Sequence, residues 1–403
     1  MGPIAKKNFE TSVKKIDKIR EKIKQGTSTF FNESLKYIGV FVGIFIFVLI
    51  IVDELNYYTS FAFIIGSLTS IFLGYLSNHV ATETNARVTF IVYENIYDRD
   101  TAYNQAFQTA LKGACVIGYS LVSLAMINLT LLIILYLKLL KPVSLAEFTY
   151  IFESLAGYGF GASIVALFNR IGAGIYSKSC DISADLIGRI DNIDQDLATA
   201  AVIADNIGDN IGKILGICSD FFCTFCEALC AILIVSGMSP TLTQGANFFW
   251  PFLIAASGIV ICIISSLIAM SSKVSEKKDV QKTLSDQLDY ATTIMTVMVI
   301  AIAYYGLPET ISFNKLTMGA QGSTIGYTVE KSDILTCVLI GLIAGIGIGY
   351  NSYYFTAPEN PPCQQLAYYC KNGPAINIIQ GFSLGYLSCV TPAIIIACKI
   401  VLI

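Results

Sequence analysis

The sequence is poor in charged residues, which make up only 14% of its 403 positions, whereas 54% of the residues are hydrophobic. A water-soluble domain of this length could not bury so much apolar surface, so the composition excludes a soluble globular protein. The formal net charge of −3 gives no indication of nucleic-acid binding. We therefore expect an integral protein of the lipid bilayer.

Other signals are scarce or missing as well. No stretch alternates polar and apolar residues as the strands of a transmembrane barrel do, and no linker rich in Pro, Ser or Gly separates two domains. No apolar run lies near the start, so a cleaved signal peptide is not expected. The single histidine, His79, lies at the end of an apolar run, where a solvated role is favoured over proton transfer. The twelve cysteines lie mostly within or beside apolar runs, which favours apolar packing over disulfides or zinc binding.

Long apolar runs, in contrast, are abundant. A helix needs roughly 17 to 25 mainly apolar residues to cross about 30 Å of hydrocarbon. The sequence therefore predicts an all-α, polytopic transmembrane bundle with about nine spans. The predicted spans are residues 37–52, 58–78, 108–137, 151–176, 207–237, 249–271, 289–307, 333–352 and 377–401.

Basic residues concentrate on one side of this predicted bundle. Residues 1–36 carry nine Lys and Arg, and the connection after the sixth span carries four lysines between 273 and 282. If the spans alternate, both segments lie on the same side, which the positive-inside rule makes cytoplasmic. We predict a basic cytoplasmic arm at 1–36 that touches anionic lipid, followed by one transmembrane domain at 37–403. Its cytoplasmic acidic loop is 178–213.

Two stretches rich in glycine, "GYGFGAS" at 157–163 and "GLIAGIGIGY" at 341–350, are similar in composition to nucleotide-binding loops. Neither follows a strand in a βαβ unit, so we interpret both as sites of close packing between membrane helices. Residues 80–106 are polar and are expected to continue the second span as a helix. Residues 308–332 are expected to form the longest loop on the non-cytoplasmic side.

Charged residues gather between the fourth and fifth spans. Lys178, Asp181, Asp185 and Arg189 recur at a spacing that places them on one stripe of a helix. Carboxylates bind Mg²⁺ while Lys and Arg bind phosphate oxygens, so this mixture predicts a site for a polyphosphate with divalent ions. The alternative is a solvated connection with ordinary helix-end charges. The further acids of the cluster are Asp205 and Asp209 in a matching stripe before the fifth span, and Asp191, Asp194 and Asp196 in the connection.

Three more charges fall inside the adjacent spans. Arg170 lies in the fourth span, and Asp220 and Glu227 lie seven residues apart on one face of the fifth. A charge at bilayer depth costs at least ~2.5 kcal/mol, so such residues generally pair with one another and line a pathway. Arg170 with either acid would form a proton relay beneath the acidic cluster. A structural buried ion pair is the alternative.

These same segments resemble a known family. The stretches "GASIVALFNRIGAGIYSKSCDISADLIGRID", "AVIADNIGDNIG" and "SDFFCTFCEALCA" are similar to the signature region of the membrane-bound, proton-translocating inorganic pyrophosphatases. Weaker similarity extends over nearly the whole chain. That family consists of homodimers of many-helix subunits that hydrolyse pyrophosphate with Mg²⁺ and pump H⁺, in some members Na⁺, away from the cytoplasm. The resemblance implies a multi-pass protein of an endomembrane, such as a vacuole or an acidocalcisome-like organelle.

The resemblance also implies roles for particular residues. It implies substrate binding by Lys178 and Arg189, and it places the catalytic position at Asp209 and Lys213. The implied metal ligands are Asp181, Asp185, Asp205 and Asp209, and the implied proton pathway is Arg170, Asp220 and Glu227.

The chain departs from the family pattern at two of these positions. Arg189 stands where the family has a lysine, and a guanidinium can still bind phosphate bidentately. Lys213 stands where the family has an aspartate that helps to activate the attacking water. A protonated lysine can neither accept that proton nor hold Mg²⁺, so we expect it to pair with Asp209 or to bind phosphate.

A third departure is length, because the family's first helix and its last set of helices have no counterpart in this sequence. Those last helices supply the second half of the acidic site. Two hypotheses follow. The chain is a proton pump completed by a homodimer partner, a second polypeptide or a continuation, or it is a catalytically inactive, truncated relative with a binding or regulatory role.

Overall fold

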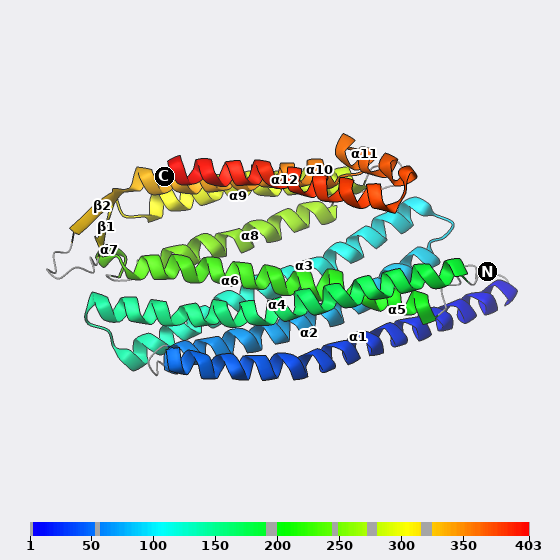
Figure 1. Cartoon of the computed structure of the whole chain (residues 1–403), viewed down its shortest axis with the longest axis horizontal. Coiled ribbons are helices and arrows are strands. Elements are labelled where there is room, and N and C mark those ends of the chain that lie inside the picture. Colours follow the sequence, from blue (N-terminus) through cyan, green and yellow to red (C-terminus); the bar gives the residue numbers. More distant parts are fainter. Residues whose placement is uncertain are drawn as a thin grey trace. The chain divides into compact units, whose positions relative to one another are not determined.

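The computed structural model describes residues 3–52, 57–190, 200–243, 249–271, 280–315 and 325–402, and these are almost entirely helical. The chain forms two compact units, residues 1–292 with 313–326 and residues 293–312 with 327–403. Figure 1 shows the elements coloured in chain order. Within the described residues, eight helices are long and apolar enough to cross a membrane. The predicted all-α, polytopic membrane bundle is therefore confirmed.

The first unit holds the helices that carry the charged cluster. Their bounds are α1 (Pro3–Val52), α2 (Tyr57–Glu94), α3 (Arg99–Leu140), α4 (Leu145–Ile190), α5 (Ala200–Asp209), the π-helix η1 (Asn210–Leu215), α6 (Gly216–Gly237), α7 (Pro240–Thr243) and α8 (Trp250–Ser271). The helix α1 runs without a break through the predicted arm and the first span. The helix α2 continues the second span to Glu94, and a turn capped by Asp98 separates it from α3.

The length of α4 explains how one helix reaches from the membrane to a polar site. Its 46 residues extend for about 69 Å, more than twice the roughly 30 Å of the hydrocarbon layer. Its apolar part is therefore long enough to span the bilayer, with length left over for the charged stripe at its C-terminal end. The predicted continuation of the fourth span as a helix is confirmed.

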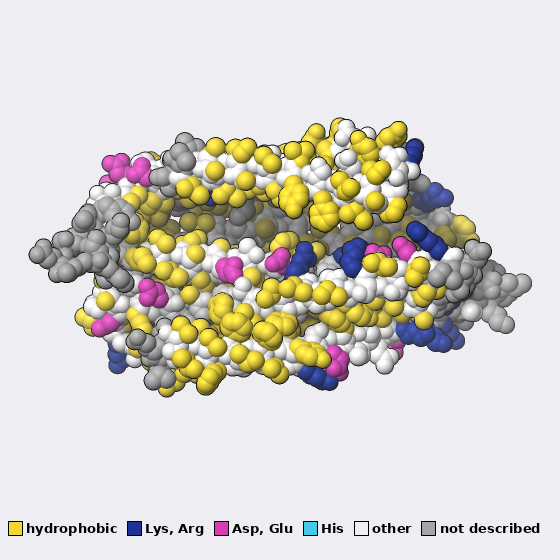
Figure 2. Space-filling model, in the orientation of Figure 1, with side chains coloured by type: hydrophobic (Ala, Val, Ile, Leu, Met, Phe, Trp, Pro, Cys, Tyr) yellow, Lys and Arg dark blue, Asp and Glu magenta, His cyan; other side chains and the backbone are white. Residues whose placement is uncertain are grey.

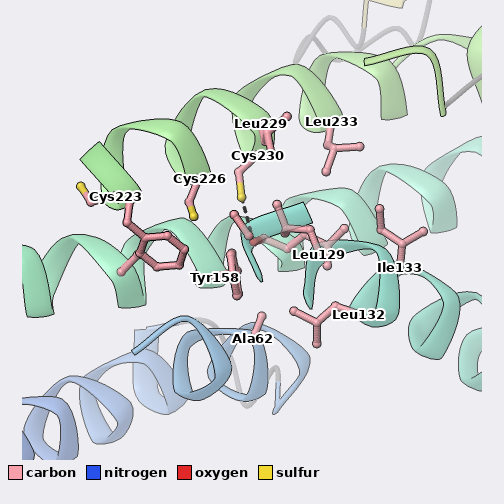
Figure 3. Close-up of a cluster of buried hydrophobic side chains, with 14 of the residues drawn as sticks. Ala62, Leu129, Leu132, Ile133, Tyr158, Cys223, Cys226, Leu229, Cys230 and Leu233 are labelled. Atoms are coloured by element: carbon pink, nitrogen blue, oxygen red, sulfur yellow. Dashed lines mark hydrogen bonds between the residues drawn. The ribbon is translucent and has the colours of Figure 1, made fainter. Parts of the chain in front are cut away.

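The core of the first unit lies where α4 packs between α2 and α6. A Cβ atom at Gly66 would collide with the carbonyl oxygen of Tyr158, and one at Gly161 with that of Phe63, so these glycines let the backbones of α2 and α4 touch. Figure 3 shows Tyr158 among cysteine and leucine side chains of α6. Cys226 and Cys230 are buried there, as the packing interpretation predicts, whereas Cys262, Cys370, Cys389 and Cys398 are exposed.

The second unit is built from the end of α9 (Val280–Gly306), α10 (Lys331–Thr356), α11 (Pro361–Tyr369), the short helix η3 (Cys370–Asn372) and α12 (Pro374–Leu402). α10 packs against α12. The predicted span 289–307 falls in α9, which is helical to Gly306. The predicted loop at 308–332 contains two hydrogen-bonded strands, β1 (Thr310–Lys315) and β2 (Ile325–Glu330).

Candidate functional site

The C-terminal end of α4 presents the first charged stripe. The Lys178 Nζ atom lies 3.1 Å from Asp181 Oδ2, three residues further along the helix. Both side chains remain open to solvent, at 76% and 46% exposure, so this ion pair does not close off the lysine. Asp185 and Arg189 follow and are exposed as well. The stripe predicted from the sequence is therefore present as a row of accessible charges.

The second stripe lies on α5 and on the π-helix that joins α5 to α6. The Lys213 Nζ atom lies 2.8 Å from Asp209 Oδ1, so the predicted pairing of Lys213 with Asp209 is made. Lys213 belongs to η1, and π-helical turns are frequent at functional sites. A carboxylate held by an ammonium group is a weaker ligand for a metal ion than a free one. Asp209, at the end of α5, is thus paired with Lys213 of the adjoining η1.

Two glycines bring this second stripe against the first. A Cβ atom at Gly212 would lie 2.7 Å from Ser177 Cβ, and one at Gly208 would lie 3.1 Å from Ser177 Cα. Larger residues at either position would push α5 and η1 away from α4. On the other side, Ile203, Ile207 and neighbouring side chains form a buried cluster with Phe31 of α1. Gly208 and Gly212, the repeated glycines of "NIGDNIGK", therefore allow the acidic stripe to lie next to the segment of α4 that carries Lys178.

The acids of the two helices lie close enough to affect one another. The carboxyl group of Asp205 is within electrostatic reach of Asp209, Asp181 and Asp185, as well as of Lys213. Carboxylates that face each other in this way repel unless cations lie between them. The arrangement therefore favours positive charge in the space that α4 and α5 share. Asp191, Asp194 and Asp196 lie outside the described residues.

The donor set suits Mg²⁺ in kind, because carboxylate oxygens are the ligands that this ion prefers. In the described part of the chain, however, no group of three or more His, Cys, Asp or Glu side chains is placed to hold a metal ion. Two of the four candidate carboxylates, Asp181 and Asp209, are already paired with lysines. The residues present thus fit one wall of a magnesium site and require further ligands to complete it.

The charged residues inside the spans lie on α4, which also carries the first stripe, and on α6. Arg170 of α4 and both Asp220 and Glu227 of α6 are exposed, and no ion pair joins them among the described residues. Among the described residues, the structure therefore shows neither the predicted pairing of Arg170 with an acid nor the alternative of a buried ion pair. Figure 2 shows acidic and basic side chains following one another along this face of the molecule.

The structure also adds residues that sequence reasoning did not single out. Ser163 Oγ donates a hydrogen bond to Glu227 Oε1 at 2.7 Å, which fixes that carboxylate against α4. Asn169 Nδ2 donates to Ser219 Oγ at 2.8 Å in the buried seam between α4 and α6. The polar Ser163 and Asn169 inside an apolar run were the available signal, because buried polar groups need partners.

Comparison with known sequences places this arrangement in context. A sequence model of the family "Inorganic H+ pyrophosphatase" matches residues 4–403. The chain belongs to this family. The resemblance seen in the charged segments therefore extends over essentially the full length of the chain.

Individual relatives agree with this assignment. The K(+)-insensitive pyrophosphate-energized proton pump of Caldanaerobacter subterraneus subsp. tengcongensis is 28% identical over 405 residues, which cover 96% of this chain and 53% of the relative. The K(+)-insensitive pyrophosphate-energized proton pump of Methanosarcina mazei is 27% identical, covering 96% and 51%. Pyrophosphate-energized membrane proton pump 3 of Arabidopsis thaliana is 29% identical, covering 86% and 42%. The chain thus spans about half the length of these pyrophosphatase-family relatives.

Proposed function

We propose that this chain is part of a membrane pump that hydrolyses Mg²⁺-bound inorganic diphosphate and moves H⁺ across the bilayer. The observation that supports the proposal is the position of the charged residues on α4 and the α5–α6 segment, which would supply both parts of such a pump. Facing acidic and basic stripes lie at one end, and exposed charges follow along the same helices into the membrane. The pump names of the relatives support the same reaction.

Within this proposal, the stripes of α4 and α5 bind the substrate. Lys178 and Arg189 are exposed bases and would bind phosphate oxygens, Arg189 in the bidentate manner of a guanidinium. Asp181, Asp185 and Asp205 would hold Mg²⁺. When bound, the ion supplies charge neutralisation and polarisation of the phosphoryl groups. Ligands from outside the described residues would complete the site.

The membrane charges would carry the proton. Arg170 and Asp220 are exposed at a depth where charge must face protein or water rather than lipid. Glu227 accepts a hydrogen bond from Ser163, so its carboxylate has a defined position from which to take and release a proton. We propose that helices of a second copy or of another polypeptide cover this row. The homodimer and the endomembrane location, vacuolar or acidocalcisome-like, belong to the same proposal.

A second candidate function rests on the contact between Lys213 and Asp209. An ammonium group 2.8 Å from this carboxylate competes with any metal ion and cannot act as a base while it is protonated. A chain in this state would bind magnesium diphosphate through Lys178 and its neighbours without hydrolysing it. It would then act as a binding or regulatory membrane protein.

Binding and turnover can be measured separately on the purified chain in lipid vesicles. Thermal unfolding with magnesium and pyrophosphate tests binding, because a ligand at about 100 times its Kd stabilises the folded state by about 2.7 kcal/mol. Phosphate release and acidification of the vesicle lumen test the pump.

The expected result is a stabilisation that Lys178→Ala removes. Phosphate release would support the pump, and release that rises in Lys213→Asp would identify Lys213 as the limiting position. Binding without release in either form would support the second candidate. A chain that shows neither stabilisation nor release would overturn both.

A further inference from the structure

A half-open cavity of about 880 Å³ lies in the first unit beside the charged cluster, lined by α1, α2, α3 and the α5–α6 segment. Its volume falls within the roughly 300–1,000 Å³ of typical small-molecule sites. Most of its wall is apolar and includes Ile19, Ile117 and Leu121. Neither the stripes of α4 nor the row of charges inside the spans requires such a space. The cavity is therefore a candidate binding site for a separate ligand.

The charge on the cavity wall has one sign. The charged residues that line it are Arg20 and Lys213, and no carboxylate lines it among the described residues. Arg20 contacts three acids outside the wall, Asp17 at 3.0 Å, Glu83 at 3.3 Å and Glu21 at 3.9 Å. Lys213 contacts one, Asp209, at 2.8 Å. A guanidinium has five N–H donors and an ammonium three, so both retain donors. The buried Nε atom of Arg20 has no hydrogen-bond partner among the described residues.

The cavity extends from a basic end at Arg20 to an apolar end along α3. Arg20 lies on the basic part of α1, on the side that the positive-inside rule makes cytoplasmic. From there the wall follows α3 from Ala110 to Leu121, about 16 Å into the apolar part of the helix. The amides of Asn206 and Asn210 add polar groups to the wall near Lys213. A suitable occupant is anionic at the cytoplasmic end and apolar along α3.

We propose that this cavity binds an anionic lipid of the cytoplasmic leaflet, with its head group at Arg20 and Lys213 and an acyl chain along α3. The proposal goes beyond the proposed function, since it assigns a second ligand to a separate space. The shared chemistry of the head group is a carboxylate or a phosphate monoester. Binding of this lipid would place an anion beside the ammonium group that also holds Asp209.

Gly118 provides a direct test because it lines the cavity and a Cβ atom built on it would meet no described atom within 4 Å. Gly118→Phe should fill the space without disturbing a neighbour. Replacing a helical glycine also favours the helix by up to about 1 kcal/mol. Gly43 of α1 is equally open and does not line the cavity, so Gly43→Phe is the matched control.

The experiment uses the full chain in phosphatidylcholine vesicles with photoactivatable single-chain lipids. Three probes carry the same diazirine-bearing acyl chain, with a carboxylate, a glycerophosphate or a phosphocholine head group. After illumination, the labelled peptides are identified by mass spectrometry. We expect both anionic probes to label residues 110–121 of α3, and labelling should fall at least roughly tenfold in Gly118→Phe but not in Gly43→Phe. Gly118→Leu serves as a smaller replacement.

The head group is tested by Lys213→Gln, which should reduce the preference for anionic probes over the phosphocholine probe by roughly tenfold. An excess of pyrophosphate should leave the labelling unchanged, which separates a lipid site from the phosphate site on α4. Equal labelling of the Gly118→Phe chain, equal labelling by all three probes, or displacement by pyrophosphate would each overturn the proposal.

Discussion

Two stretches rich in glycine differ in what they touch. In α4, a Cβ atom at Gly157 or Gly161 would collide with the backbone of α2. In α10, a Cβ atom at Gly345 or Gly349 would meet no described atom within 4 Å. The sequence of each stretch predicts close packing between helices. Among the described residues, the glycines of α4 pack closely against another helix, whereas Gly345 and Gly349 of α10 do not.

The difference shows that small residues permit close packing without causing it. The segment that contains α10 is the more apolar of the two, yet none of its most apolar window is buried, whereas 67% of that of α4 is buried. Lipid is as apolar as a helix surface, so burial between membrane helices depends on a partner with a matching surface. The helix α4 has two such partners, α2 and α6.

The largest expected effect comes from filling the contact between α2 and α4. Gly161→Leu should destabilise the chain by more than about 3 kcal/mol, because its Cβ atom would collide with the Phe63 carbonyl group and the backbone cannot give way as a side chain can. The measurement is thermal unfolding in detergent followed by the fluorescence of Trp250. Gly39→Leu, at an open position on α1, is the control. A Gly161→Leu chain with an unchanged melting temperature would show that α2 and α4 do not pack so closely.

A smaller loss of stability is expected when an asparagine that joins two helices of the same unit is replaced. Asn169 joins α4 to α6 in the first unit, and Asn351 joins α10 to α12 in the second. Asn169→Ala should cost about 1–3 kcal/mol, because it removes a buried hydrogen bond and leaves Ser219 without its partner. Asn351 Nδ2 donates to the Ser388 carbonyl oxygen at 2.9 Å, and this contact between α10 and α12 is only partly buried. Asn351→Ala should therefore cost less, about 0.5–1.5 kcal/mol. Equal costs, measured by the same unfolding assay, would contradict the difference in burial.

Much of the fold was predictable because hydropathy and helical spacing are local properties. The apolar runs predicted the spanning helices, and the spacing of Lys178, Asp181 and Asp185 predicted one stripe of α4. The span predicted at 289–307 lies almost entirely within α9, which is helical from Val280 to Gly306. The two strands at 310–330 were missed because composition alone gave only a turn-rich loop.

The sequence indicated which residues could belong to the candidate site, but it did not indicate how those residues are arranged in space. The roles of Asp185, Asp205 and Asp220 stay predictions. Spacing along one helix cannot show how closely a second helix approaches, and that approach depends on the contacts of Gly208 and Gly212 with Ser177. The hydrogen bond from Ser163 to Glu227 likewise joins residues far apart in the sequence. The cavity beside Lys213 depends on four segments and has no sequence signature of its own.

The smallest expected effect is at the open glycines of α10. Gly345→Leu should leave the melting temperature of the purified chain unchanged or raise it slightly, since a helical glycine costs up to about 1 kcal/mol relative to better helix formers and no described atom lies in the way. The same fluorescence assay applies, with Gly161→Leu as the contrasting variant. A marked loss of stability would mean that another helix covers this face in the membrane. In that case α10 would follow the same rule as α4, with a partner supplied from elsewhere in the assembly.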